Sequence, residues 1–220
     1  MWDFIKKHLS IKLEALDKFY VLLAIYFATY AFSPILSAGK DINFFGYPLM
    51  PGSLMLIFNT SIISLIQDNY GKDAAKKMVV GGIIGRLFVW SFTLIVLMLP
   101  SLHEVPGYDK IVSSGFRILL AGITARYFGQ LLIDIPLFQK VRGATKSFAW
   151  AYIAAMLVNI FIERAIFVII AKAGTGGNLF DRFIAHSIVS IIFVVLLTPV
   201  VSFLNHVLFH KNNSIPVNSN

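Results

Sequence analysis

Six long apolar stretches constrain the fold of this chain more than any other feature. They cover residues 19–38, 49–66, 79–100, 115–138, 148–173 and 183–208. A helix rises about 1.5 Å per residue, so roughly 20 apolar residues cross the hydrocarbon layer of a bilayer. Inside that layer the backbone must satisfy its own hydrogen bonds, which favours helices. We therefore expect an all-α membrane protein, a bundle of six transmembrane helices joined by short loops.

Composition supports a bilayer as the solvent of this chain. Of 220 residues, 57% are hydrophobic and 14% are charged, whereas about a quarter of the residues in a soluble domain are charged. Six crossings use up this length, so no soluble domain is expected. The absence of cysteine excludes disulfides and thiolate metal sites. We expect no metal and no cofactor.

The positions of lysine and arginine predict the orientation, because these residues collect on the cytoplasmic side of membrane proteins. With the N-terminus inside, four basic residues face outward: Lys40, Lys110, Lys172 and Arg182. Eleven face inward: Lys6, Lys7, Lys12, Lys18, Lys72, Lys76, Lys77, Lys140, Arg142, Lys146 and Lys211. Both termini are therefore expected in the cytoplasm. The predicted parts are a cytoplasmic segment at 1–18, the transmembrane domain at 19–208 and a flexible polar tail at 209–220.

This distribution also explains the net charge of +8 without nucleic acid as a partner. The segment 1–18 holds four lysines and is too charged for a cleaved signal peptide. The expected partners are the lipid bilayer and a small-molecule substrate. The sequence leaves open a homo-oligomer.

Six ionisable residues fall within the apolar stretches: Arg86, Arg117, Arg126, Asp134, Glu163 and Arg164. A charge near the middle of the membrane costs several kcal/mol, about 3 on insertion scales, and usually faces the interior of a bundle. Such residues either tie helices together or form a polar cavity for a solute. Arg86 and Arg117 lie nearer the ends of their stretches, where each either holds the bundle together or snorkels to its edge.

Three amides accompany these charges, because Asn59, Gln130 and Asn159 also lie within apolar stretches. An amide in hydrocarbon must find hydrogen bonds. Gln130 precedes Asp134 by one turn, and Asn159 precedes Glu163 by one turn. The candidate substrate-binding residues are Asp134, Glu163, Asn159, Gln130, Arg126 and Asn59.

Sequence signatures of enzymes are missing from this chain. It contains no Gly-x-Ser-x-Gly elbow, no His-Glu-x-x-His helix and no phosphate-cradling Gly-x-x-x-x-Gly-Lys loop. We therefore expect a protein that is not an enzyme.

From Leu49 to about Leu204 the chain resembles the queuosine precursor transporters, also called the vitamin uptake transporter family. The resemblance rests on Gln-Asp-Asn-Tyr-Gly at 67–71 with Ala-Ala-Lys-Lys at 74–77, and on the Gln, Asp and Phe of 130–140. Residues 159–167 and Leu-Thr-Pro at 197–199 extend it. This chain differs in having Ser64 and Glu163 where the family typically has aspartates.

The resemblance implies a multi-pass protein of the cell inner membrane that takes up a queuosine precursor, a planar 7-deazaguanine base. It implies that Asp134 and Glu163 bind the N–H groups of that base. Two other functions remain open: a substrate-capture subunit of an energy-coupling factor transporter, which works with energy-coupling subunits, and a membrane assembly protein whose charges pair with a partner helix.

Overall fold

The computed structural model describes residues 15–39, 42–44, 46–49, 51–99, 108–172 and 178–209. Its elements are α2 (Ala15–Gly39), β1 (Ile42–Phe44), β2 (Tyr47–Leu49), α3 (Gly52–Tyr70), α4 (Lys72–Met98), α5 (Tyr108–Ala125), the π-helix η1 (Arg126–Asp134), α6 (Ile135–Thr145), α7 (Phe148–Lys172) and α8 (Leu179–Phe209). Most of the predicted segment 1–18 lies outside the described residues, as does the predicted tail apart from its first residue.

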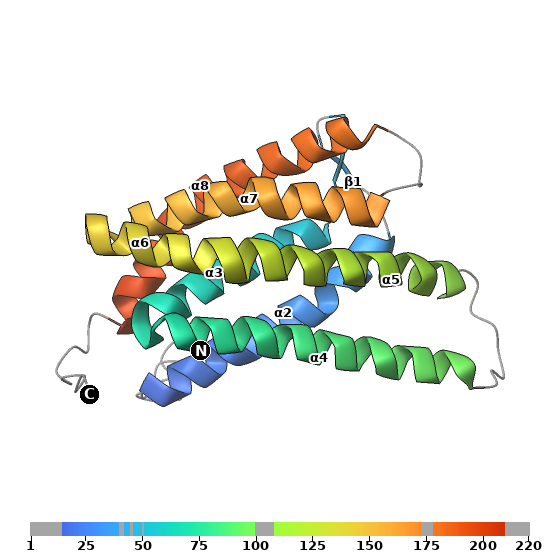
Figure 1. Ribbon diagram of the computed structural model, residues 1–220, viewed down its shortest axis with the longest axis horizontal. Helices are drawn as coiled ribbons and strands as arrows, with labels where there is room; N and C mark the ends of the chain where they lie inside the picture. The colour runs from blue at the N-terminus through green and yellow to red at the C-terminus, as the bar shows by residue number, and fades with distance from the viewer. Residues whose placement is uncertain are drawn as a thin grey trace, which may run out of the picture.

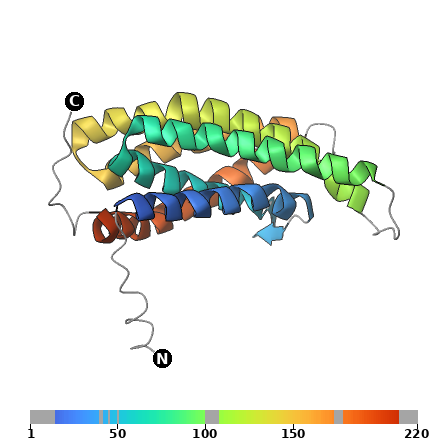
Figure 2. The same cartoon turned by 90° about the horizontal axis from the view of Figure 1, so that it is seen from below.

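The helices form one bundle of roughly aligned rods, with α5, η1 and α6 continuous as a single rod (Figure 1). Seen from below, α4 and the α5–α6 rod lie on one side and α2 on the other (Figure 2). Helix α7 packs along α5, η1 and α6, and also against α8. The predicted helical class is confirmed, and each of the six apolar stretches lies mainly within one rod.

Helix α3 is the central helix of the bundle, although its apolar stretch is the shortest. It contacts α2, α4, α6, α7 and α8. Every residue from Asn59 to Gln67 is buried, and this run includes three hydroxyls and two amides. Hydroxyl and amide groups that face lipid lose their hydrogen bonds to water, which is energetically unfavourable. Its place at the centre gives those polar groups protein partners.

Four helical segments among the described residues are long and apolar enough to cross a membrane. They are Lys72–Val96, Gly115–Thr145, Phe148–Ala171 and Leu179–Phe209. These segments make the chain a multi-pass membrane protein. Crossings by α2 and α3, and thus the count of six, stay a prediction.

Two breaks in the helices have local causes. Gly71 has a positive φ of 88°, a conformation open to glycine, and it separates α3 from α4. The charged residues Lys72, Asp73, Lys76 and Lys77 therefore lie in the first turns of α4. Pro136 stands in the first turn of α6, just after η1. Because proline lacks an N–H and its ring crowds the carbonyl four residues earlier, the wider π-turns before it relieve that contact.

A short hairpin of β1 and β2 precedes α3, where an irregular entry to the helix is encoded by prolines. The strands pair antiparallel, with Ile42 opposite Leu49 and Phe44 opposite Tyr47. Gly46 turns the chain with a φ of 88°. Its N–H donates to the Asn43 side chain at 2.7 Å. Helix α3 thus starts at Gly52, three residues after the beginning of the apolar stretch 49–66.

The start of α2 and the end of α8 meet at the same end of the bundle. The Lys18 ammonium donates a hydrogen bond to the Leu208 carbonyl. The Tyr70 ring packs edge-on against Phe19 at 5.1 Å and against Phe209 at 5.7 Å. The predicted even number of crossings requires the first and last helices to meet in this way.

Candidate functional site

All six predicted binding residues are buried in the interior of the bundle. Their exposed fractions are between 0 and 6% for Asn59, Arg126, Gln130, Asp134, Asn159 and Glu163. Asn59 comes from α3, three residues come from η1, and two come from α7. The fold therefore gathers polar groups from three helices that are far apart in the sequence.

The π-helix η1 carries a line of hydrogen bonds along its buried face. The Arg126 guanidinium donates to Oε1 of Gln130. Nε2 of Gln130 donates to Oδ2 of Asp134 at 2.7 Å. Gln130 thus links Arg126 to Asp134 along this face. Because the linking amide donates at one end and accepts at the other, it joins a cation to an anion without direct contact between them.

Helix α3 holds the cationic end of this line. Nη1 of Arg126 donates to Oγ1 of Thr60 at 2.8 Å, and its Nη2 donates to the Leu56 carbonyl at 2.9 Å. Oγ1 of Thr60 also lies 3.2 Å from Oε1 of Gln130. Thr60 was not among the predicted site residues. Its signal in the sequence is a hydroxyl next to Asn59 within an apolar stretch.

Helix α7 brings the second carboxylate to Arg126. Nη1 of Arg126 lies 3.7 Å from Oε1 of Glu163. Gly129 makes the approach possible, because a Cβ at this position would collide with Oδ1 of Asn159 and Cγ of Glu163. Glycine is the residue that lets a neighbouring helix come this close.

Several polar atoms of this cluster have no hydrogen-bond partner among the described residues. They are Oδ1 of Asp134, Oε1 of Glu163, Oδ1 of Asn159, Nδ2 of Asn59 and Nε of Arg126. A buried polar atom without a partner is unfavourable by about 1–3 kcal/mol. Three acceptors and two donors in one interior cluster are a set that a ligand with both N–H and carbonyl groups would satisfy.

The remaining predicted charges are placed differently from one another. Arg117 is exposed on α5, in line with a position at the bundle edge. For Arg86, the structure favours the reading in which it lies inside the bundle. Its side chain is buried, and its guanidinium carbon lies 4.5 Å from the ring centroid of Tyr30. Arg164 points to α8, where its Nε donates to Oγ of Ser190 at 3.0 Å.

A second polar network closes the end of the bundle where α3 finishes. Oδ1 of Asp68 accepts from Nε of Arg142 at 2.5 Å, and its Oδ2 accepts from Nδ2 of Asn205 at 2.9 Å. Asn69 donates to Oδ1 of Asn205 at 2.7 Å. Asp68 thus ties α3 to α6 and α8. The family motif at 67–71 lies at this junction.

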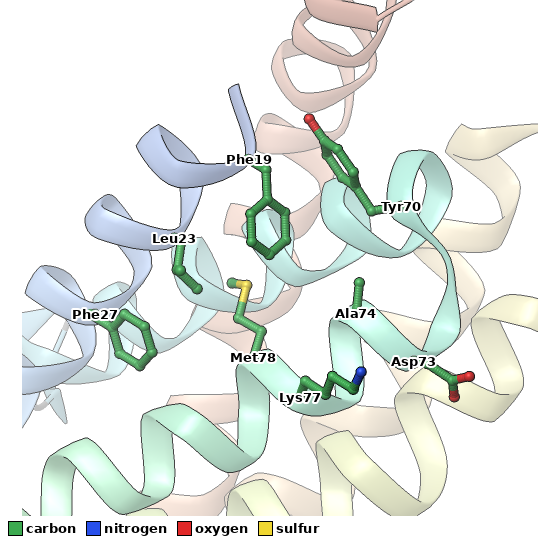
Figure 3. A pocket seen from close by; sticks show the side chains of 8 residues that line it. All are labelled: Phe19, Leu23, Phe27, Tyr70, Asp73, Ala74, Lys77 and Met78. Atoms are coloured by element: carbon green, nitrogen blue, oxygen red, sulfur yellow. The ribbon is translucent and has the colours of Figure 1, made fainter. Parts of the chain in front are cut away.

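An open pocket of about 490 Å³ lies between α2, the end of α3 and α4 (Figure 3). Its lining is aromatic and aliphatic apart from Asp73 and Lys77. It includes none of the predicted binding residues. Because this lining offers few donors and acceptors, the interior cluster is the better candidate for recognition of a polar solute.

Comparison with known protein families gives one match. A family model described as "Putative vitamin uptake transporter" matches residues 51–204. The match covers well over half of the chain and contains all six predicted binding residues. No curated protein and no solved structure matches the chain. The family match runs from the start of α3 almost to the end of α8, and the chain belongs to the vitamin uptake transporter family.

Proposed function

We propose that this protein takes up a queuosine precursor, a planar 7-deazaguanine base, across the cell inner membrane. The observation that carries the proposal is the interior cluster of two carboxylates, three amides and Arg126 drawn together from α3, η1 and α7. Membership in a family of uptake transporters supports transport of a small molecule. The chemistry of the cluster narrows the kind of molecule.

The donor and acceptor pattern of the cluster complements the edge of a guanine-like base. Such an edge presents two neighbouring N–H donors and one carbonyl acceptor. The Glu163 carboxylate, with an acceptor lacking a partner, stands beside Arg126, which has a donor lacking a partner. A carboxylate accepts from the N–H groups while a guanidinium donates to the carbonyl. An apolar solute would leave both the carboxylate and the guanidinium without a hydrogen bond.

We assign the individual roles from these contacts. Asp134, Glu163 and Asn159 accept hydrogen bonds from the base. Arg126 and Asn59 donate to it, and Gln130 positions Asp134 through its 2.7 Å hydrogen bond. Buried charge-assisted hydrogen bonds contribute about 1.5–3 kcal/mol each. Two of them account for most of the discrimination between a guanine-like base and one without the carbonyl or amino group.

The six helices cross the membrane with both termini in the cytoplasm. Lys18, Lys72, Lys76 and Lys77 on α2 and α4 lie at the bundle end where α3 finishes, as does Lys146 at the end of α6. This basic end faces the cytoplasm by the positive-inside rule. The binding residues are at most 6% exposed. A solute therefore reaches them only when helices separate at one end, as alternating access requires.

Uptake in cells tests this function. Cells that lack their own carrier and their own synthesis of queuosine precursors are given radiolabelled queuine or a precursor base. Expression of this protein is expected to restore uptake and queuosine in tRNA. Well-expressed protein that restores neither would disprove the substrate. Restoration that depends on added energy-coupling subunits would identify a substrate-capture subunit.

A further inference from the structure

Arg86 is a buried cation that the proposed binding residues do not include. It lies on α4 and is 2% exposed. Its Nε and Nη1 have no hydrogen-bond partner among the described residues. Its guanidinium carbon lies 4.5 Å from the Tyr30 ring centroid. The face of the ring stabilises the positive charge, but it leaves the N–H groups of Nε and Nη1 without acceptors among the described residues.

Two tyrosines of α2 add donors to this group, Tyr30 directly beside Arg86 and Tyr26 through its stacking on Tyr30. Tyr26 and Tyr30 stack with their centroids 5.6 Å apart and an interplanar angle of 16°. Both are almost fully buried, and both hydroxyls lack a hydrogen-bond partner in the described part of the chain. The guanidinium carbon of Arg126 lies 5.5 Å from the same Tyr30 ring. This second group therefore adjoins the proposed binding cluster.

Two glycines provide space for these side chains. A Cβ at Gly122 on α5 would lie 2.5 Å from Nη1 of Arg86. A Cβ at Gly82 on α4 would lie 2.6 Å from the Tyr26 hydroxyl. The backbones of α4 and α5 thus approach the polar ends of Arg86 and Tyr26 without side chains of their own. The packing of α4 and α5 therefore leaves room for the side chains of Arg86 and Tyr26 inside the bundle.

The charges of the interior do not balance. Among the described residues, three arginines are buried, Arg86, Arg126 and Arg164, against two carboxylates, Asp134 and Glu163. Arg126 pairs with Glu163. Buried charges are retained where they meet a partner of opposite charge. The donors of Arg86, Tyr26 and Tyr30 that lack acceptors among the described residues point to an anion as their partner.

We propose that Arg86, Tyr26 and Tyr30 bind a carboxylate of the transported solute. This inference rests on the proposed function and narrows its substrate: among 7-deazaguanine bases, the preferred one carries an acidic substituent. The amides and carboxylates around Gln130 then hold the base, and the Arg86 group holds its acidic end. A small inorganic anion such as chloride has the same acceptor chemistry, so the experiment includes it.

Trp90 offers a binding signal, because it is buried on α4 one turn after Arg86. The full-length protein is purified in nanodiscs with Trp2→Phe and Trp150→Phe, which leaves Trp90 as the reporter. It is titrated with 7-carboxy-7-deazaguanine and with the neutral 7-cyano base, in chloride and in gluconate buffers. The variants are Arg86→Gln, Arg86→Lys and Tyr30→Phe. Arg117→Gln, on the exposed face of α5, is the matched control.

The carboxy base is expected to bind at least about tenfold more tightly than the cyano base, because a charge-assisted hydrogen bond is lost with the neutral group. In Arg86→Gln, the ratio of the affinity for the carboxy base to the affinity for the cyano base should fall to near one. The affinity for the cyano base itself should stay within about twofold of the value in the parent protein. Arg86→Lys and Tyr30→Phe, which keep the charge and the ring respectively, should retain an intermediate ratio. An unchanged ratio in Arg86→Gln, or no preference in the parent protein, would overturn the inference.

Two further outcomes separate this inference from the proposed function. Binding of the two bases with equal affinity, together with saturable chloride binding that Arg86→Gln abolishes, overturns the solute carboxylate and identifies a chloride site. If neither base binds, the proposed substrate is wrong. Formate then tests the Arg86 group by itself: a saturable Trp90 response that Arg86→Gln removes supports a carboxylate site, and an equal response in both proteins overturns it.

Discussion

The guanidinium of Arg126 lies 3.7 Å from the carboxylate of Glu163, and both side chains are almost completely buried. The pair joins η1 to α7. The distance exceeds that of a hydrogen bond, and Oε1 of Glu163 has no hydrogen-bond partner among the described residues. Glu163 is therefore held near its cation while it keeps an acceptor for another molecule. One contact serves both the structural and the recognition roles considered for these charges.

A double-mutant cycle should detect the structural part of this contact. Glu163→Gln leaves Arg126 buried without a carboxylate beside it, so it is expected to destabilise the protein by about 3–5 kcal/mol. Arg126→Gln should have a similar cost. The double variant should recover about 1–3 kcal/mol relative to the sum. Thermal unfolding in detergent measures all three. Additive losses would show that the two side chains do not interact.

Gly129 should tolerate no side chain. In Gly129→Ala the new methyl group meets Asn159 and Glu163, so α7 must move away from η1. We expect a loss of about 1–3 kcal/mol in stability and a loss of base binding. Gly143→Ala is the matched control, because nothing lies within 4 Å of its Cβ position. There, alanine should stabilise α6 by up to about 1 kcal/mol. Equal effects at the two positions would contradict the close approach.

Asp68 should matter for stability at the end of the bundle. Asp68→Asn removes the charge that accepts from Arg142 and Asn205. A loss of about 1–3 kcal/mol is expected, as for hydrogen bonds to a charged group. Asp73→Asn, an exposed carboxylate on α4, should change stability by less than about 0.5 kcal/mol. Unfolding midpoints of the two variants compare them, and equal shifts would rule out the proposed tie between α3, α6 and α8.

The helices and the candidate site could be predicted because both depend on local composition. Runs of about 20 apolar residues specify crossings by length alone. Asn59, Asp134 and Glu163 are conspicuous because a polar residue within such a run must find a partner inside the bundle. The observed helix boundaries differ from the apolar stretches by several residues where charged turns lengthen a helix, as at the start of α4 at Lys72.

The features that could not be predicted depend on contacts between distant segments. Arg86 stands about four turns inside α4, and its burial depends on Tyr30 from α2 and on space at Gly122 on α5. The π-helical pitch of η1 is not encoded by any periodicity in the apolar residues. Asp68 at a helix end favours solvation by default, and its partner Arg142 is 74 residues away.

Single cysteines can test the orientation cleanly, because the chain has none of its own. Asn178→Cys precedes α8 at the end expected outside, and Gly143→Cys lies in α6 at the end expected inside. Both positions are exposed. In intact cells, a membrane-impermeant maleimide should label Asn178→Cys and should reach Gly143→Cys only after lysis. The reverse pattern would place both termini outside.

Direct binding to the purified protein tests the central claim most directly. A 7-deazaguanine base is titrated calorimetrically into the parent protein, Asp134→Asn, Glu163→Gln and the surface control Gln139→Glu. The parent and the control should bind with equal affinity. Each site variant should lose at least about tenfold, the equivalent of one charge-assisted hydrogen bond. Unchanged affinity in both folded site variants would contradict the account and leave Asp134 and Glu163 with structural roles only.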